Sequence, residues 1–167
     1  MPVSSDLKHS DPLIAATYLT TRHLFGVIDK AGEPLMYHAF RVSSYGRTME
    51  EKIVGMLHDT VEDAWQSLVR ANHLDENVEA VFAFLKTYFS DEVVDAVNAI
   101  TRREGETYRD FIRRVGKNDL ATRVKLNDLR DNTDPRRTST LVVKQSLLDR
   151  YAWAKSYLLT KDKQEGG

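Results

Sequence analysis

The stretch Thr48–Ala64, TMEEKIVGMLHDTVEDA, decides the fold class of this chain. Its apolar residues recur at i, i+3, i+4 and i+8, the spacing of one face of an α-helix; they are Ile53, Met56, Leu57 and Val61. Thr48 precedes an acidic first turn, which is typical of a helix start. We therefore predict one helix over Met49–Ala64 that turns its apolar side toward a core.

The rest of the chain repeats this pattern between short loops. We expect a helix from Pro12 to about Arg22, a second that contains His38 and ends near Gly46, and others over 65–73, 78–88, 91–101, 108–115, 119–132 and 141–159. No alternating run typical of a strand is present. The prediction is an all-α, single-domain multi-helix bundle over 1–167, with a motif core at about 15–137, a C-terminal packing helix at 138–160 and a tail at 161–167.

The composition excludes several classes of site. The 167 residues include no cysteine, which excludes a disulfide scaffold, a thiolate zinc site, an iron–sulfur cluster and a cysteine nucleophile. Apolar runs are far shorter than the roughly 20 residues of a membrane span, and no signal peptide is visible at the N-terminus. We therefore expect a cytoplasmic protein without a membrane partner.

A net charge of −1 hides an internal asymmetry. Residues 49–100 carry 11 acidic and 3 basic side chains, whereas residues 101–137 carry 11 basic and 7 acidic ones. The basic residues are interleaved with acids and follow no nucleic-acid-binding motif, so no nucleic-acid partner is expected. The asymmetry indicates a cation site facing a phosphate site, and the C-terminal helix leaves the choice between a monomer and an oligomer open.

The segment Leu57–Asp63, LHDTVED, holds the strongest candidate chemistry. His58 and Asp59 differ by about 100° around a helix axis, close enough to converge on one ion. Glu62 and Asp63 follow one turn later, where carboxylates could handle the protons of an attacking water. The alternative interpretation is a charged, solvated helix face.

Two further segments could complete such a site. In Val124–Asn132, the side chains of Lys125, Asp128 and Asn132 share one helical stripe; Asp128 would be a ligand, with the other two beside a phosphate or ribose. The alternative there is an amphipathic helix with ordinary ion pairs. His38, just inside a helix after a Gly-Glu-Pro loop, is either a ligand or a buried core histidine.

Taken together, these segments resemble the HD-domain metal-dependent phosphohydrolases. More narrowly, they are similar to the hydrolase domain of the RelA/SpoT alarmone enzymes and to its small stand-alone versions. The similarity spans about residues 15–137 and rests on segments in matching order: Lys30–His38, Leu57–Asp63, Ile100–Arg102, Glu106–Arg114 and Lys125–Asn132.

The resemblance implies one divalent ion, commonly manganese, held by His38, His58, Asp59 and Asp128. It also implies that Glu62 and Asp63 are the catalytic carboxylates. The substrate contacts that it suggests are Lys30, Tyr108, Lys125 and Asn132. The implied activity is removal of the 3′-pyrophosphate from guanosine tetra- and pentaphosphate, the alarmones of the stringent response, so the expected partner is a purine nucleotide.

One departure from the family concerns the base of the nucleotide. The family usually carries a basic pair before the Gly-Glu-Pro loop, and its first member stacks on the purine; here that position is Asp29. Two alternatives therefore stand beside the guanine substrate. One is a phosphatase of another purine nucleotide, such as an adenine alarmone or a phosphorylated dinucleotide cofactor, and the other is a catalytically silent nucleotide-binding module.

Overall fold

The computed structural model describes residues 7–8, 10–29, 32–138 and 145–165, and within these ranges every regular element is a helix. This confirms the all-α prediction. The helices are α1 (Pro12–His23), α2 (Leu35–Ser44), α3 (Met49–Leu57), α4 (Thr60–Asp63), α5 (Trp65–Asn72), α6 (Val78–Lys86), α7 (Asp91–Ile100), α8 (Tyr108–Val115), α9 (Asp119–Asn132), α10 (Pro135–Thr138) and α11 (Gln145–Glu165).

Side-chain caps set the starts of many of these helices. Each capping oxygen accepts a backbone N–H of the first turn, which satisfies a donor that has no partner within the helix. The capping residues are Asp11, Thr48, Asn77, Ser90, Thr107 and Asn118. Short polar residues at these positions explain why the predicted starts of α1, α3 and α6 to α9 agree with the structure.

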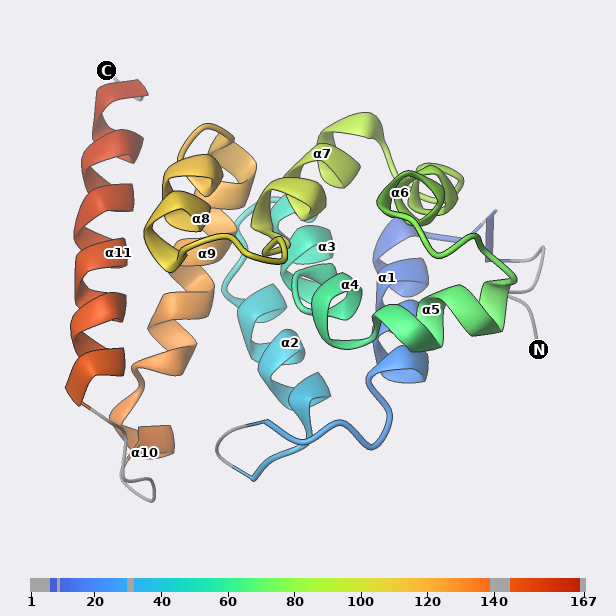
Figure 1. The fold of residues 1–167 in the computed structure, drawn as a ribbon, viewed down its shortest axis with the longest axis horizontal. Coiled ribbons are helices and arrows are strands. Elements are labelled where there is room, and N and C mark those ends of the chain that lie inside the picture. The colour runs from blue at the N-terminus through green and yellow to red at the C-terminus, as the bar shows by residue number, and fades with distance from the viewer. Residues whose placement is uncertain (1–6, 9, 30–31, 139–144, 166–167) are drawn as a thin grey trace.

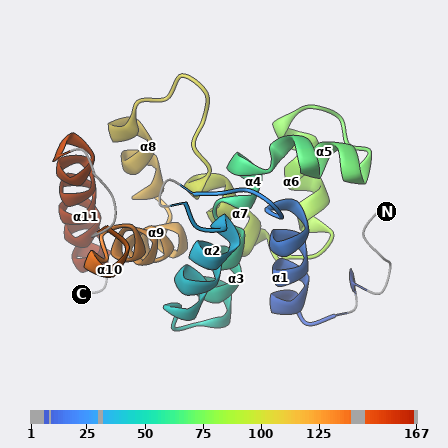
Figure 2. The same cartoon turned by 90° about the horizontal axis from the view of Figure 1, so that it is seen from below.

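The helices pack around one large apolar core, and Leu24, Leu35 and Ala64 form a small second cluster. Figure 1 places α2 and α3 in the middle of the molecule, with α11 along one edge, α9 between α11 and α2, and α5 and α6 at the opposite end. The same order is seen from below in Figure 2. Buried side chains from α1 through α9 join the core, and α11 adds Ala154 and Leu158. Within the described ranges, no helix combines the length and the apolar character needed to cross a membrane.

A glycine sets the close approach of α2 and α3. A Cβ atom on Gly55 would lie 2.9 Å from the Cα atom of Ser43, closer than real Cβ contacts allow. The Ser43 hydroxyl also donates to the Lys52 carbonyl at 2.8 Å and ties the two helices together. The contact matters because His38 on α2 and His58 at the end of α3 both lie on the buried sides of this pair.

The predicted helix over Met49–Ala64 is interrupted, which corrects the sequence-based boundary. α3 ends at Leu57, and α4 begins at Thr60. At the break, side chains bond the last carbonyls of α3: His58 Nδ1 lies 2.8 Å from the Gly55 oxygen, and the Thr20 hydroxyl donates to the Met56 oxygen at 2.8 Å. His58 and Asp59 therefore lie at a helix junction rather than inside one continuous helix.

Two other boundaries differ from the prediction. The short helix α10 begins at Pro135, whose fixed φ suits the first turn of a helix, and the periodicity of the sequence did not indicate it. α11 continues to Glu165, where a tail from residue 161 was expected. Residues 139–144, with the predicted start of the last helix at Leu141, lie outside the described residues, as does the candidate contact Lys30.

Candidate metal centre

Four side chains from three parts of the chain bring acceptor atoms to one point. His38 Nε2 lies 3.2 Å from His58 Nε2 and 3.1 Å from Asp128 Oδ1. Asp59 Oδ2 lies 3.5 Å from His38 Nε2 and 3.2 Å from His58 Nε2. The helices α2, α3 and α9, which carry or adjoin these residues, contact one another, and α2 and α3 lie at the centre of Figure 1.

This cluster is closed on one side and open on the other. His38, His58 and Asp128 are 2–3% exposed, so protein surrounds them. The Asp59 side chain keeps 26% of its surface exposed and marks the side from which solvent reaches the cluster. Asp59 is therefore the member of the cluster with the largest solvent-exposed surface.

The second nitrogen of each imidazole indicates which ring atom faces the cluster. His58 Nδ1 lies 2.8 Å from the Gly55 carbonyl oxygen, which can only accept, so Nδ1 carries the proton. His38 Nδ1 lies 2.7 Å from Asp131 Oδ2, a buried carboxylate that plays the same part. Both Nε2 atoms are thereby left to present lone pairs to one another and to the carboxylates.

Asp128 is held in place by its own helix. Lys125 Nζ, one turn earlier on α9, donates to Asp128 Oδ2 at 2.7 Å. The Asn132 amide, one turn later, donates to Asp128 Oδ1. The i, i+3 and i, i+4 spacing places these donors along the Asp128 carboxylate, so they fix its direction toward the histidines.

The charges of the cluster shift its pKa values strongly. Burial opposes protonation of His38, but hydrogen bonds with Asp128 and Asp131 outweigh it and raise its pKa to about 10. Burial likewise opposes protonation of His58, and the charge of Asp59 raises its pKa nonetheless. For Asp128, Lys125 and the histidines overcome the effect of burial and hold the pKa below its ordinary value. These carboxylates and imidazoles stabilise positive charge at the point where they meet.

The donor set fits a divalent cation. Two imidazole nitrogens and carboxylate oxygens, without a thiolate, suit Mn²⁺ and equally Fe²⁺, Co²⁺ or Zn²⁺. Lone pairs only 3.2 Å apart repel each other unless a proton or a metal ion lies between them. The buried cluster of His38, His58 and Asp128 can therefore hold a divalent metal ion, and Asp59 is placed to add a fourth ligand.

The two candidate catalytic carboxylates lie on α4, the helix directly after this cluster. Glu62 and Asp63 are both exposed. Glu62 Oε2 accepts the backbone N–H of Arg102 at 2.9 Å, which ties α4 to the loop between α7 and α8. The helix break before α4, rather than one unbroken helix row, sets where these carboxylates stand relative to His58 and Asp59.

That loop is itself anchored by a half-buried ion pair. Arg114 on α8 donates to Glu106 at 2.7 and 2.8 Å. The same guanidinium donates to backbone carbonyls at the C-terminal end of α7, those of Asn98, Ala99 and Thr101. Because these bonds fix both ends of the loop, they also fix the Arg102 N–H that holds Glu62. The sequence marked this segment only as part of a resemblance.

The three described residues that were predicted to contact the substrate differ in what they bond. Lys125 and Asn132 both bond Asp128, so their first role in the described structure is to orient that carboxylate. Tyr108 is half-buried, and its hydroxyl has no hydrogen-bond partner among the described residues. Burial raises the pKa of Tyr108 to about 12. The roles of Tyr108, Lys125 and Asn132 toward a substrate stay predictions.

Sequence reasoning missed Asp131 and Arg41, which lie behind His38. Asp131 is 0% exposed, and its Oδ1 accepts from Arg41 Nε at 2.8 Å. One signal was available in the sequence. Val124, Asp128 and Asp131 follow the 4 and 3 spacing of one helix face, so two acids continue a buried apolar stripe. Lys125 can pair with Asp128 within the helix, but Asp131 has no base three or four residues away, which indicates a partner on another helix.

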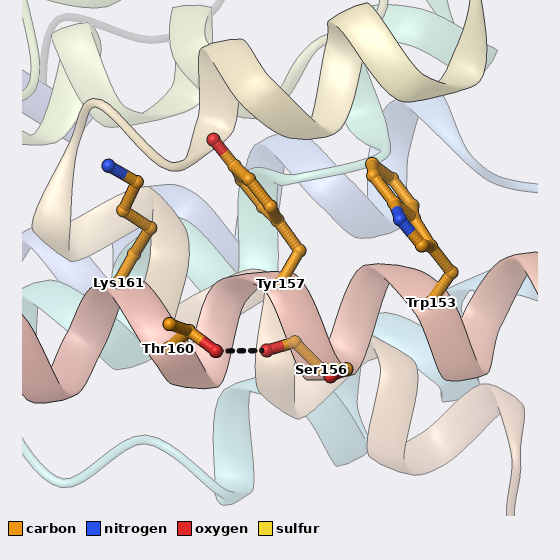
Figure 3. A pocket seen from close by; sticks show the side chains of 5 residues that line it. All are labelled: Trp153, Ser156, Tyr157, Thr160 and Lys161. Atoms are coloured by element: carbon orange, nitrogen blue, oxygen red, sulfur yellow. Dashed lines mark hydrogen bonds between the residues drawn. The ribbon is translucent and has the colours of Figure 1, made fainter.

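A separate open pocket of about 340 Å³ lies on α11, and no member of the cluster lines it. Figure 3 shows Trp153, Tyr157 and Lys161 extending from one side of this helix. The two aromatic rings stack with their centroids 5.5 Å apart, and the Thr160 hydroxyl donates to the Ser156 carbonyl at 3.0 Å. The pocket lacks acidic groups and histidines, so its residues do not suit a metal ion.

Comparison with known proteins adds no identification to this geometry. No protein-family model and no curated protein matches the chain.

Proposed function

We propose that this protein is a divalent-metal-dependent nucleotide phosphohydrolase of the HD-domain type, with Mn²⁺ as its metal. The observation that supports the proposal most directly is the convergence of His38, His58 and Asp128 within 4.8 Å, with Asp59 beside them. These residues come from three of the five segments on which the resemblance to the family rests. Two further carboxylates on the next short helix complete the set needed for hydrolysis.

The roles of the side chains follow from their chemistry. A divalent ion held by His38, His58, Asp59 and Asp128 would neutralise phosphate charge and acidify the attacking water. Glu62 and Asp63 would accept and return protons at their carboxylate oxygens, because both are exposed and close in sequence to the ligands. Lys125 and Asn132 would keep Asp128 oriented throughout, and the Arg102 N–H would hold Glu62.

The proposed reaction is removal of the 3′-pyrophosphate from guanosine tetra- or pentaphosphate. Water attacks the phosphorus that is bonded to the ribose 3′ oxygen, the bond between these atoms breaks, and the 3′ hydroxyl takes up a proton. The products are pyrophosphate and a nucleotide with a free 3′ hydroxyl. A purine nucleotide is then the partner, and the resemblance described above is the basis for the guanine base.

A second substrate class is favoured by Asp29. Its Oδ1 accepts the Glu33 backbone N–H at 2.9 Å, so this side chain shapes the turn before α2. A carboxylate used in this way does not stack on a purine as the family's basic residue does. The alternative substrates are an adenine alarmone or a phosphorylated dinucleotide cofactor, cleaved at the same site.

The test is a panel of purine nucleotides with Mn²⁺, with phosphate and pyrophosphate separated by ion chromatography. We expect pyrophosphate from the guanine alarmones. Release only from an adenine alarmone, or phosphate from a phosphorylated dinucleotide, would select the second class. Binding of metal and nucleotide without any turnover would instead favour the silent binding module.

Variants can separate the proposed metal ligands from the proposed catalytic carboxylates. His58→Ala and Asp59→Ala should lose metal and turnover together, whereas Glu62→Gln and Asp63→Asn should keep the metal and lose turnover. Glu79→Gln makes the same change as Glu62→Gln, but at an exposed position on α6, and serves as the matched control. Full activity in His58→Ala or Asp59→Ala would contradict the proposed site.

A further inference from the structure

We propose that Asp131 is a positioning residue for the metal centre: it holds the proton of His38 Nδ1 so that Nε2 remains a ligand. The proposal rests on the metal binding that is part of the proposed function. Asp131 Oδ2 lies 2.7 Å from His38 Nδ1, and the Asp131 side chain is fully buried. Asp131 is outside the ligand set and acts through His38.

Asp131 accepts hydrogen bonds at its second carboxylate oxygen as well. Arg41 Nε donates to Asp131 Oδ1 at 2.8 Å, and the Tyr45 hydroxyl lies 3.4 Å from the same oxygen. One carboxylate oxygen therefore faces a guanidinium while the other faces the imidazole. A buried carboxylate that accepts from a cation is a strong and directional acceptor.

The two histidines of the site differ in how they are oriented. His58 lies at the end of α3 and reaches back to the carbonyl of Gly55, three residues earlier. His38 lies within α2, where the carbonyls are used by the helix, and its Nδ1 is met by a side chain from α9. The His58 orientation thus depends on local backbone, whereas that of His38 depends on the packing of α9 against α2.

An amide at position 131 cannot replace the carboxylate. Donors face both oxygens of Asp131, Arg41 Nε at Oδ1 and His38 Nδ1 at Oδ2, whereas an asparagine offers only one accepting oxygen. If the amide group faces His38, it donates to Nδ1 and moves the imidazole proton to Nε2. If it faces Arg41, it leaves a buried donor opposite another donor. Either arrangement weakens the metal centre.

The experiment uses Co²⁺, whose affinity is measured by calorimetry and whose absorption spectrum reports its ligands. We expect Asp131→Asn to weaken binding about 10- to 100-fold, the range of such second-layer partners, and to change the spectrum. Arg41→Met is a second variant on a partly exposed side chain, with a smaller loss expected. Glu33→Gln is the matched control, because Glu33 contacts Arg41 at 3.4 Å and is 47% exposed. The Co²⁺ affinity of this variant should stay within about twofold of wild type.

A proton NMR measurement of the Co²⁺ protein separates positioning from a general loss of structure. Each bound imidazole should give one shifted, exchangeable Nδ1–H signal. In Asp131→Asn, the His38 signal should be lost or displaced while the His58 signal stays. Unchanged affinity and unchanged signals in Asp131→Asn would overturn this inference alone. A wild-type protein that binds no Co²⁺ or Mn²⁺ would overturn the proposed metal centre and this inference with it.

Discussion

The contact between α3 and α9 contains two buried charged regions that are built in opposite ways. In one, Glu51 accepts from Arg123 Nε at 2.7 Å and from the Arg47 backbone N–H at 2.8 Å. In the other, His58 and Asp128 meet His38 and Asp59, and acceptor atoms face acceptor atoms. The first region neutralises its charge within the protein, whereas the second is built to stabilise an added cation.

The difference separates a structural ion pair from a binding site. Burying a charge costs free energy, and a partner that donates back offsets this cost. Glu51 has such partners at both carboxylate oxygens. In the His58 region, Lys125 compensates Asp128, but the two imidazole Nε2 atoms face each other at 3.2 Å, a distance that requires a proton or a metal ion between them. Burial by itself therefore does not identify the functional charges; the match of donors and acceptors does.

The largest expected effect concerns the structural pair. Glu51→Ala should lower the free energy of unfolding by about 3 kcal/mol, because it leaves Arg123 and a backbone N–H without their acceptor. Denaturant unfolding would measure this, and the Mn²⁺ affinity of the folded variant should stay that of wild type. If Glu51→Ala had the unfolding free energy of wild type but bound no Mn²⁺, the two regions would not have the separate roles described above.

A change in the cluster around His58 should instead alter how strongly Mn²⁺ stabilises the protein. Mn²⁺ at about 100 times its dissociation constant should stabilise wild type by about 2.7 kcal/mol. His58→Ala should lose this stabilisation, since one of the converging nitrogens is gone. Thermal unfolding with Mn²⁺ and with a chelator would measure both, and Glu51→Ala provides the comparison. An equal response to Mn²⁺ in His58→Ala would place the metal elsewhere.

His23 extends the comparison to a buried histidine that bonds no carboxylate in the described part of the chain. Burial and then the charge of Arg22 lower its pKa to about 4 from the ordinary 6.5, and its Nε2 has no hydrogen-bond partner among the described residues. Because the pKa is lower in the folded state, between pH 6.5 and about 4 the His23 ring binds a proton in the unfolded chain but stays neutral in the folded chain. Its contribution to stability is complete above pH 6.5 and is lost as the pH falls toward 4.

His23→Gln should remove this part of the acid sensitivity, about 2 kcal/mol at about pH 5. The measurement is denaturant unfolding of both proteins across this range. His73→Gln, at an exposed histidine, is the matched control and should keep the wild-type profile. Parallel curves for wild type and His23→Gln would show that His23 is not the group that titrates there.

The smallest expected effect belongs to the pair that anchors the loop between α7 and α8. Glu106→Gln weakens the contact with Arg114 and should lower kcat about tenfold, or about 1.4 kcal/mol in the activation free energy, through the Arg102 N–H that holds Glu62. The metal affinity should not change. Glu104→Gln, an exposed acid of the same loop, should keep the wild-type kcat. A loss of metal in Glu106→Gln would argue against a role limited to Glu62.

Much of this architecture could be predicted from particular residues. The cap at Thr48 and the apolar spacing after it gave the correct start of α3, because both act within one or two turns. The starts predicted at residues 91, 108 and 119 also agree with the structure, in which Ser90, Thr107 and Asn118 are the caps. The break after Leu57 could not be predicted in this way. At the break, the Thr20 hydroxyl bonds the carbonyl of Met56, 36 residues later in the chain, and the His58 ring bonds the carbonyl of Gly55.

The sequence by itself determined the helical fold class and the kinds of ligand that the chain can offer. With no cysteine, those ligands are imidazoles and carboxylates, and they lie in short segments that local spacing identified. Only the tertiary structure decided that His38, His58 and Asp128 meet, and that Asp131 lies behind His38. The physical reason is that helix spacing acts over a few residues, whereas this cluster depends on the close contact of α2 with α3 at Gly55 and on the packing of α9 against both.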